Sequence, residues 1–504
     1  MTFPKSMSTW LVALGVMCAA HIHADTRPNI VFFLVDDMGW QETSVPFHTE
    51  VTELNRRYRT PNMQHLAAEG MKFTQAYASA VCSPTRVSAI TGMNAARHRV
   101  TNWTLRKNAS PDNPHKTLQP PAWNVNGICM EQGIERTFQV TPLPSLLQEA
   151  GYRTIHVGKA HFGAKETPGN DPLNLGFDVN IAGHAAGGPG SYWGMKNFSA
   201  AWRTDPPAVI WDVPGLESYH GKNIYLTEAL TIEAIKAVEQ SVVEKQPFYL
   251  YMSHYAVHAP WEKDDRFYQK YIDAGLKPFE ATLASMIEGM DKSLGDIMSA
   301  IKRLGVEENT IVIFMSDNGS PSQCPRNLPL RGHKITPYEG GTREPMIVKW
   351  PGVTEPASSC DVPLIIEDFF PSMLELANVD WRGKTKQPVD GRSFVPLLKG
   401  KKHESENRNF IWHYPHNYSG QQPFSAIRRG PWKLIHHHAD HRMELFNLET
   451  DIGEKHNHAA EQPARVKQLA IELGKELRSK QALMPINKTT GKPVAFADEV
   501  LQHD

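Results

Sequence analysis

The sequence predicts an α/β protein with a large, mixed, mainly parallel sheet sandwiched by helices. A small C-terminal antiparallel sheet plus a helix is expected to follow it. The first observation is a set of continuous apolar runs, typical of strands buried on both faces, at residues 28–35, 248–252 and 310–315. The second is that stretches with helical periodicity separate these runs, as at 223–246 and 280–304. The third is a change of pattern after residue 400, where short strand-like runs follow one another closely.

The length and the N-terminus predict a divided, exported chain. At 504 residues the protein exceeds one ordinary core, so we expect a large domain over 25–400 and a C-terminal α+β subdomain over 401–504. Residues 1–24 combine Lys5, a short apolar run and a terminal Ala24, which is the pattern of a signal peptide and is too short for a membrane span. A lipoprotein modified at Cys18 is the alternative, although the preceding Met17 is bulky. The protein is therefore predicted to be secreted or periplasmic.

Composition excludes several functional classes. A net charge of −1 and a pI near 7.1 give no electrostatic basis for binding nucleic acid. Of five cysteines, Cys18 falls in the signal segment, and Cys129, Cys324 and Cys360 are too few for a disulfide framework. At most one bridge could form among those three, and its pairing stays open.

Acidic and amide side chains follow two of the predicted buried strands. Asp36 and Asp37 come directly after the strand at 28–35, and Asp317 and Asn318 come after the strand at 310–315. Parallel strands bring their carboxyl ends to one edge of a sheet, where ligands bind. Adjacent carboxylates repel each other unless a cation lies between them, so we expect a hard cation with oxygen ligands. A helix cap or a turn is the alternative.

Basic side chains follow other predicted elements. Lys159 and His161 alternate after a strand at 154–157, His254 and His258 follow the strand at 248–252, and Lys334 lies in a later loop. Taken alone, the Lys-x-His pair would be a solvated strand edge. The glycine-rich segment 183–194 lacks the setting of a nucleotide-binding loop, and we interpret it as a loop on the substrate side.

The C-terminal part is predicted from short runs near residues 409–413, 425–428, 432–436 and 443–448, followed by a helix at 463–479. The run His436, His437 and His438, with His441 nearby, is expected to end a strand and cross a hairpin. Metal binding by these histidines is the alternative.

The stretch around Cys82 has a less common pattern, Cys-x-Pro-x-Arg, which ends at Arg86. Proline disfavours a helical conformation in the residue before it, so we expect a turn that delivers Cys82 and Arg86 at the start of a helix. Such a helix start favours bound anions, and the arginine adds a forked donor for oxyanions. A small buried cysteine in a capped turn is the alternative.

This stretch resembles the signature of the formylglycine-dependent (type I) sulfatases of the alkaline-phosphatase-like superfamily. The resemblance covers residues 28–485 and is strongest with bacterial polysaccharide sulfatases. It implies that a formylglycine-generating maturation enzyme converts Cys82 to formylglycine (3-oxoalanine). It also implies a calcium ion, Ca²⁺, with ligands from Asp36, Asp37, Cys82, Asp317 and Asn318.

The resemblance further implies roles for the remaining residues. Lys159, Lys334 and His258 would contact the sulfate, and Arg86 would brace the formylglycine. One hydroxyl of the hydrated aldehyde, activated with the help of Asp317, would attack sulfur. His258 would protonate the leaving alcohol, His161 would take a proton from the second hydroxyl, and His254 would orient His258. His333 precedes Lys334 where many relatives have glycine, which would alter substrate fit.

The expected function is therefore a secreted, calcium-dependent sulfatase acting on sulfated carbohydrate, in which rings of residues 412–416 could stack on sugar. One alternative is a phosphonate or phosphodiester hydrolase with the same nucleophile. Comparing turnover of aryl sulfates and aryl phosphates separates the two. Another alternative is a non-catalytic glycan-binding protein with an unconverted Cys82, which mass analysis would reveal.

Overall fold

A mixed sheet of nine strands forms the centre of the protein. The computed structural model describes residues 1–2, 27–203, 208–323, 326–401 and 408–501. The strand order is β11–β2–β10–β9–β1–β8–β6–β7, and β12 pairs with β2. The neighbouring strands from β9 to β7 are parallel, whereas β10 is antiparallel to both β9 and β2. The predicted mixed, mainly parallel sheet is confirmed.

The strands of this sheet have the following bounds: β1 (Asn29–Val35), β2 (Met71–Tyr77), β6 (Arg153–Gly158), β7 (Val179–Ile181), β8 (Phe248–Ser253), β9 (Thr310–Ser316), β10 (Arg343–Lys349), β11 (Ser358–Cys360) and β12 (Leu364–Ile365). Shorter pairs lie outside it: β3 (Leu118–Gln119) with β17 (Ile486–Asn487), and β4 (Ile128–Cys129) with β5 (Phe138–Gln139).

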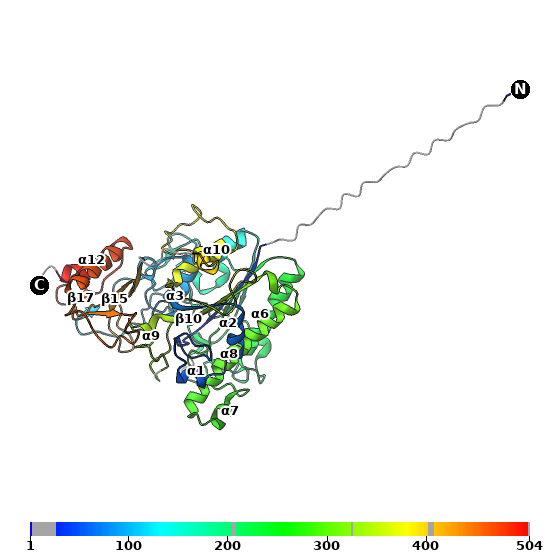
Figure 1. The fold of residues 1–504 in the computed structure, drawn as a ribbon, viewed down its shortest axis with the longest axis horizontal. Coiled ribbons are helices and arrows are strands. Elements are labelled where there is room, and N and C mark those ends of the chain that lie inside the picture. Colours follow the sequence, from blue (N-terminus) through cyan, green and yellow to red (C-terminus); the bar gives the residue numbers. More distant parts are fainter. Residues whose placement is uncertain (3–26, 204–207, 324–325, 402–407, 502–504) are drawn as a thin grey trace.

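Helices cover both faces of the sheet, as Figure 1 shows. On one face lie α3 (Cys82–Thr91), α5 (Leu143–Glu149) and α10 (Phe369–Leu376), and on the other lie α2 (Pro61–Glu69), α6 (Leu226–Val243) and α8 (Pro278–Arg303). Successive side chains of β1 therefore enter different cores, with Phe32 in the first and Phe33 in the second. This burial on both faces explains why the strand is a continuous apolar run.

Short helices complete the fold: α1 (Glu53–Arg57), α4 (Ala95–His98), α7 (Tyr268–Asp273), α9 (Glu339–Thr342), α11 (Val395–Leu398) and α13 (Ala497–Val500). Within the described ranges, no helix is both long enough and apolar enough to cross a membrane. The predicted signal segment falls almost entirely in residues 3–26, which lie outside the described residues.

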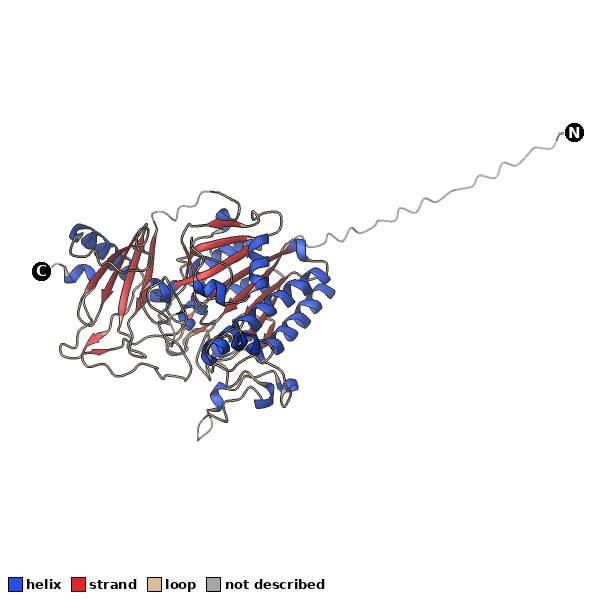
Figure 2. Cartoon of the chain, turned by 60° about the horizontal axis from the view of Figure 1, so that its bottom comes forward, coloured by secondary structure: helices blue, strands red, loops and turns tan. Residues whose placement is uncertain are grey.

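A second, antiparallel sheet forms the C-terminal part (Figure 2). It consists of β13 (Asn409–Tyr414), β14 (Phe424–Arg429), β15 (Trp432–His437) and β16 (Met443–Asn447), and α12 (Pro463–Ser479) packs on one face. The side chains on the other face, including Trp412 and Phe446, pack into the same core as Phe32 of β1. The predicted small sheet plus helix is confirmed, whereas the boundary at residue 400 stays a prediction.

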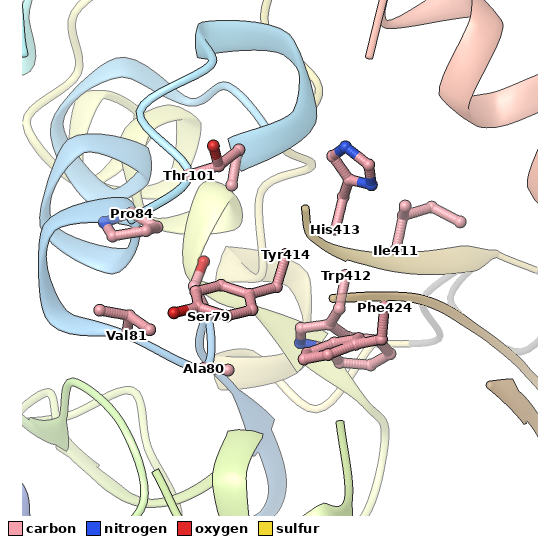
Figure 3. Close-up of a pocket in the computed structure, with 11 residues that line it drawn as sticks. Ser79, Ala80, Val81, Pro84, Thr101, Ile411, Trp412, His413, Tyr414 and Phe424 are labelled. Carbon is pink, nitrogen blue, oxygen red and sulfur yellow. The ribbon is translucent and has the colours of Figure 1, made fainter. Parts of the chain in front are cut away.

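Aromatic side chains of β13 contact the segment that carries Cys82 (Figure 3). Trp412 donates from Nε1 to the carbonyl of Ala78 at 2.9 Å, and Tyr414 is also buried. The cavity left between the two segments is about 20 Å³, room for about one water molecule and not for a sugar. Trp412 and Tyr414 are 4% and 2% exposed, so the expectation that the rings of 412–416 stack on substrate is wrong for both.

Candidate active site

Four parallel strands end at one edge of the sheet and bring the predicted site residues together. Val35 lies beside Ser316 in the register of β1 and β9, so the residues that follow each strand are neighbours. One ligand atom from each of Asp36, Asp37 and Asp317 lies within 4.8 Å of the others. All three carboxylates are buried. The sequence prediction that these strand ends converge is confirmed by this geometry.

Three cationic side chains balance the three carboxylates. Lys159 Nζ lies 2.5 Å from Asp36 Oδ2, Lys334 Nζ lies 2.6 Å from Asp37 Oδ1, and Arg86 Nη2 lies 2.8 Å from Asp317 Oδ2.

Burial and neighbouring charges perturb the carboxylates in different directions. Burial raises the pKa of Asp36 above its ordinary value even though Lys159 opposes it. Burial also acts to raise the pKa of Asp37, but the charges of Lys334 and His258 outweigh it and lower this pKa. Strongly perturbed, buried groups of this kind concentrate at functional sites.

Oxygen atoms suited to a hard cation remain available in this cluster. Asp36 Oδ1 and Asn318 Oδ1 are buried and accept no hydrogen bond from any described residue. The Asn318 amide nitrogen donates to Asp37 Oδ1 at 2.7 Å, which orients its oxygen away from that carboxylate. A donor set made only of oxygen fits calcium or magnesium better than it fits a thiophilic metal.

Cys82 is the first residue of α3, with Val81 as the N-cap residue. The prediction that Cys82 and Arg86 lie at the start of a helix is confirmed, but the stretch itself is helical rather than a turn, and Pro84 lies in the first turn of the helix. Proline is tolerated there, since the first-turn N–H groups have no partner within the helix. Burial raises the pKa of the Cys82 thiol, although the charges of Lys159 and Lys334 act to lower it. The thiol of Cys82 thus lies within the electrostatic field of both lysines.

Arg86 holds three strand ends in place from the same helix. Its guanidinium donates to Asp317 Oδ2 and to the Lys159 carbonyl, each at 2.9 Å, and contacts the Ser253 hydroxyl. The side chain is completely buried. Truncating it would leave Asp317 buried without its partner, which is a large penalty. Arg86 is therefore a positioning residue.

The geometry of His161 defines which of its ring nitrogens is basic. Nε2 lies 2.7 Å from the Thr104 carbonyl, which can only accept, so Nε2 carries the proton and Nδ1 is left with its lone pair. Nδ1 is buried without a hydrogen-bond partner among the described residues. Burial, with Lys159 adding to it, lowers the pKa of His161 well below its ordinary value. A neutral imidazole with a free Nδ1 can accept a proton.

His258, rather than His254, faces the carboxylate cluster. His258 Nε2 lies 3.8 Å from Asp37 Oδ2, and its Nδ1 donates to the Ala259 carbonyl at 2.8 Å. His254 instead bonds through Nε2 to Ser293 Oγ on α8 at 2.9 Å. The expectation that His254 orients His258 is therefore wrong, because the Ala259 carbonyl does so.

The glycine-rich segment 183–194 packs against both His161 and His258. A Cβ at Gly187 would lie 2.4 Å from Cε1 of His161, and one at Gly188 would lie 2.7 Å from Nδ1 of His258. Only glycine allows the backbone to approach these rings so closely. The segment thus fixes both rings from one side.

Backbone conformation also marks the site. Asp37 and His161 have φ angles of 62° and 59°, in the left-handed region that non-glycine residues rarely adopt. Such conformations persist where surrounding contacts over-determine them, and they concentrate at functional sites.

A cleft of about 180 Å³ opens above Asp37, His258 and Lys334. Its outer wall is formed by Trp261 and His333, and by Tyr418 from the β13–β14 connection, with further contributions from residues 321–323, Ser419 and Gln421. Burial raises the pKa of the Tyr418 hydroxyl, and the charge of Lys334 opposes this rise. The connection between β13 and β14 thus completes the mouth of the cleft.

Sequence reasoning missed several residues that support the site. Thr85 donates to the Asp317 carbonyl at 2.7 Å, Ser253 donates to the Lys159 carbonyl at 2.7 Å, and Thr104 fixes His161. Tyr418 was also missed. The only signal for Thr85 was its place inside the Cys82 motif, and the others carry none because their partners lie far away in the chain.

The histidines at the β15–β16 hairpin lie outside the site, as do the described cysteines other than Cys82. His437 ends β15 and His441 lies before β16, so the predicted hairpin is confirmed. His436 Nε2 is 3.4 Å from His441 Nδ1, and these two are in neither of the metal-compatible groups found among the described residues. Cys129 and Cys360 are free thiols, and Cys324 lies outside the described residues.

Comparisons with known proteins agree with this geometry. The sulfatase family model matches residues 28–379, and a model described as N-sulphoglucosamine sulphohydrolase, C-terminal, matches residues 333–482. A sulfatase of Formosa agariphila is 29% identical over 511 residues, covering 90% of this chain and 89% of that protein. The N-acetylgalactosamine-6-sulfatase of Mus musculus is 31% identical over 405 residues, covering 78% of this chain and 69% of that protein.

Solved structures show the same likeness. The crystal structure of Ps i-CgsB has a TM-score of 0.71 and 25% identity, and the match covers 90% of this chain and 93% of that one. A structure whose title concerns the metabolism of multiple glycosaminoglycans by Bacteroides thetaiotaomicron has a TM-score of 0.63 and 25% identity, covering 90% of this chain and 100% of that one. The chain belongs to the sulfatase family, with its alkaline-phosphatase-like fold, and is a sulfuric ester hydrolase.

Proposed function

We propose that this sulfatase cleaves sulfate esters of carbohydrate by means of formylglycine 82 and a calcium ion. One observation carries the proposal: three buried carboxylates pair with three cationic groups, and α3, which begins at Cys82, is bonded to this cluster through Thr85 and Arg86. Asp36, Asp37, Asp317 and Asn318 would supply protein ligands to calcium. When present, the calcium and the hydrated formylglycine supply positive charge and a hydroxyl nucleophile to the reaction.

The lysines and Arg86 provide the electrostatic part of catalysis. A sulfate monoester is an anion, so Lys159 and Lys334 are the residues to bind its non-bridging oxygens. Arg86 acts through Asp317, which it holds with two contacts of 2.8 and 2.9 Å. Because Lys159 and Arg86 are buried and all three side chains are already oriented by carboxylates, little reorganisation is needed when the substrate enters.

Two histidines have geometries suited to moving protons. His161 offers an unprotonated, buried Nδ1, which fits a base. Burial lowers the pKa of His258 to about 3, so this ring is neutral before the substrate binds. A bound sulfate anion near Nε2 favours the imidazolium form and raises this pKa, which is what an acid for the leaving alcohol requires.

The carbohydrate part of the proposal is supported by the relatives and by the cleft. The Mus musculus relative is named for a sulfated amino sugar, and the Bacteroides thetaiotaomicron title concerns glycosaminoglycans. The cleft above Lys334 presents the rings of Trp261 and Tyr418, which suit the apolar face of a sugar. Tyr418 is held by an edge contact with Trp103, with ring centroids 5.5 Å apart.

The variant Tyr418→Ala is expected to raise KM for a sulfated sugar about 3- to 10-fold with little change in kcat. One aromatic contact contributes about 0.5–1.5 kcal/mol, and such binding is shared by ground and transition states. A small aryl sulfate should show no comparable loss. Steady-state kinetics on both substrates measure this, with Tyr268→Ala as control, since Tyr268 on α7 is not among the described residues that line the cleft. Equal losses on both substrates would contradict a sugar-binding role.

Removal of calcium is expected to lower activity by at least about a hundredfold, because a bound cation contributes several kcal/mol to charge stabilisation. Readdition of calcium should restore the rate. Elemental analysis of the chelated protein and a thermal melt with and without calcium complete the test. An Asp36→Asn variant should lose the calcium-dependent shift in Tm. Full activity in protein shown to be free of metal would refute the assignment.

The remaining parts of the proposal concern maturation and export. Cys82 is 3% exposed in the folded chain, so the maturation enzyme would act before α3 packs into the core. We assign residues 1–24 as a signal peptide, 25–400 as the catalytic domain and 401–504 as a C-terminal subdomain. The protein would then work outside the cytoplasm, in the periplasm or beyond the cell, on sulfated polysaccharide.

A further inference from the structure

A compact group of potential metal ligands lies away from the catalytic cleft, between β16 and α12. His456, His458 and Glu461 each place one ligand atom within 4.8 Å of the other two. His456 Nε2 is 2.8 Å from Glu461 Oε1, and His458 Nδ1 is 2.9 Å from Glu461 Oε2. The single carboxylate thus joins both imidazole rings, whose centroids are 4.4 Å apart.

The backbone that carries these side chains is fixed on both sides. The Asp451 carboxylate accepts hydrogen bonds from the N–H groups of Lys455 and His456, at 2.7 and 2.8 Å. The His458 N–H donates to the Leu445 carbonyl in β16 at 2.8 Å, and the His458 carbonyl accepts from Glu461. The three ligand positions are therefore set by hydrogen bonds of the backbone and not by the side chains alone.

The side chains are oriented and still open to solution. The His458 ring packs edge-on against Trp432, with centroids 5.7 Å apart, and its side chain is 24% exposed. The side chains of His456 and Glu461 are 60% and 55% exposed, so an ion can enter from solvent.

We propose that His456, His458 and Glu461 form a second metal site, which takes a divalent transition-metal ion of the zinc type. Two imidazole nitrogens and one carboxylate oxygen suit zinc, nickel or copper, whereas calcium prefers the all-oxygen cluster at Asp36, Asp37 and Asp317. Zinc–nitrogen and zinc–oxygen bonds are about 2.0–2.2 Å long. To bind zinc, the three ligand atoms need only move to these distances from one common point. The remaining coordination position faces solvent.

A metal at this site would link two elements of the C-terminal subdomain. His458 is bonded to β16, and Glu461 lies two residues before α12 begins at Pro463. Bound metal would therefore restrain the start of α12 against the sheet. The site is remote in sequence from the catalytic residues and needs neither calcium nor formylglycine, so it is independent of the proposed catalytic mechanism.

The test measures zinc binding to the full-length protein in excess calcium, by competition with a chromophoric chelator. Wild type is expected to bind one zinc ion at this site. The variants His458→Ala and Glu461→Gln should bind it at least about tenfold more weakly, because even the loss of an outer-sphere partner lowers metal affinity about 10–100-fold. His65→Ala is the matched control, because His65 and Glu69 form an exposed histidine–carboxylate pair, 3.5 Å apart, without a second imidazole.

A second readout separates ligand loss from misfolding. Cobalt substituted for zinc should give visible absorption bands of nitrogen and oxygen coordination in wild type and in His65→Ala, and these bands should be absent from Glu461→Gln. All variants should keep the sulfatase activity of wild type, which shows that they are folded. Zinc affinity that is the same in wild type, His458→Ala and Glu461→Gln would overturn the proposal, and so would wild-type protein that binds no zinc.

Discussion

The variant Cys82→Ala is expected to lose sulfate ester hydrolysis, by a factor on the order of 10⁶ or down to the uncatalysed rate. Alanine cannot be converted to an aldehyde and supplies no hydroxyl to attack sulfur. Lys159, Lys334 and Arg86 all remain in this variant, so it should still bind sulfate esters. The measurement is kcat/KM on an aryl sulfate, together with a thermal melt.

Cys129→Ala is the matched control for this variant. Cys129 is a buried free thiol whose Sγ contacts the Glu131 carbonyl and the Thr137 hydroxyl. Both substitutions remove one small buried side-chain group, the formylglycine at position 82 and the thiol at position 129, so the two variants should lose similar amounts of stability. Only Cys82→Ala should lose activity. Near-normal turnover by a folded Cys82→Ala protein would rule out a nucleophile at this position.

The variant His258→Ala is expected to lose about 10²–10⁴-fold in kcat/KM on a sulfated sugar and much less on an activated aryl sulfate. A sugar hydroxyl is a poor leaving group and needs a proton as it departs, whereas a nitrophenolate leaves unaided. If the ring served only to contact sulfate, both substrates would suffer alike. The comparison of the two losses therefore isolates the proton transfer.

His254→Ala supplies the control for the neighbouring histidine. His254 bonds to Ser293 and contacts the ring of Phe33, so this variant should lose stability and show no dependence on the leaving group. Equal losses on both substrates in His258→Ala would remove its role as the acid. A dependence on the leaving group in His254→Ala alone would transfer the role to that residue.

Much of the site could be predicted from sequence because several of its residues follow strands that are buried on both faces. Asp36 and Asp317 come directly after such strands, and parallel pairing then brings them together. β10 could not be predicted in this way. Its sequence, REPMIVK, contains charged residues that are buried with partners from distant segments, such as Lys349 with Glu69 and Glu307.

The other predictions that failed did so because tertiary packing decides which aromatic side chains are buried. Trp412 and Tyr414 were expected to face sugar, but β13 is covered on one face by α12 and on the other by the segment of Cys82. Tyr418, by contrast, lies in a connection without any motif, and the loop near Asn113 holds that connection over the cleft through hydrogen bonds with Asn417 and Ser419. No local sequence pattern distinguishes the aromatic residues that are buried in the core, Trp412 and Tyr414, from Tyr418, which lines the cleft.

The central claim, that a modified Cys82 is the nucleophile, is tested most directly by the mass of the peptide that contains this residue. Purified, active protein is digested, and the fraction of peptide carrying an aldehyde in place of the thiol is compared with the specific activity of several preparations. We expect activity to rise in proportion to the converted fraction and to vanish at zero conversion. Full activity in a preparation whose Cys82 is entirely an unmodified thiol would contradict the central claim.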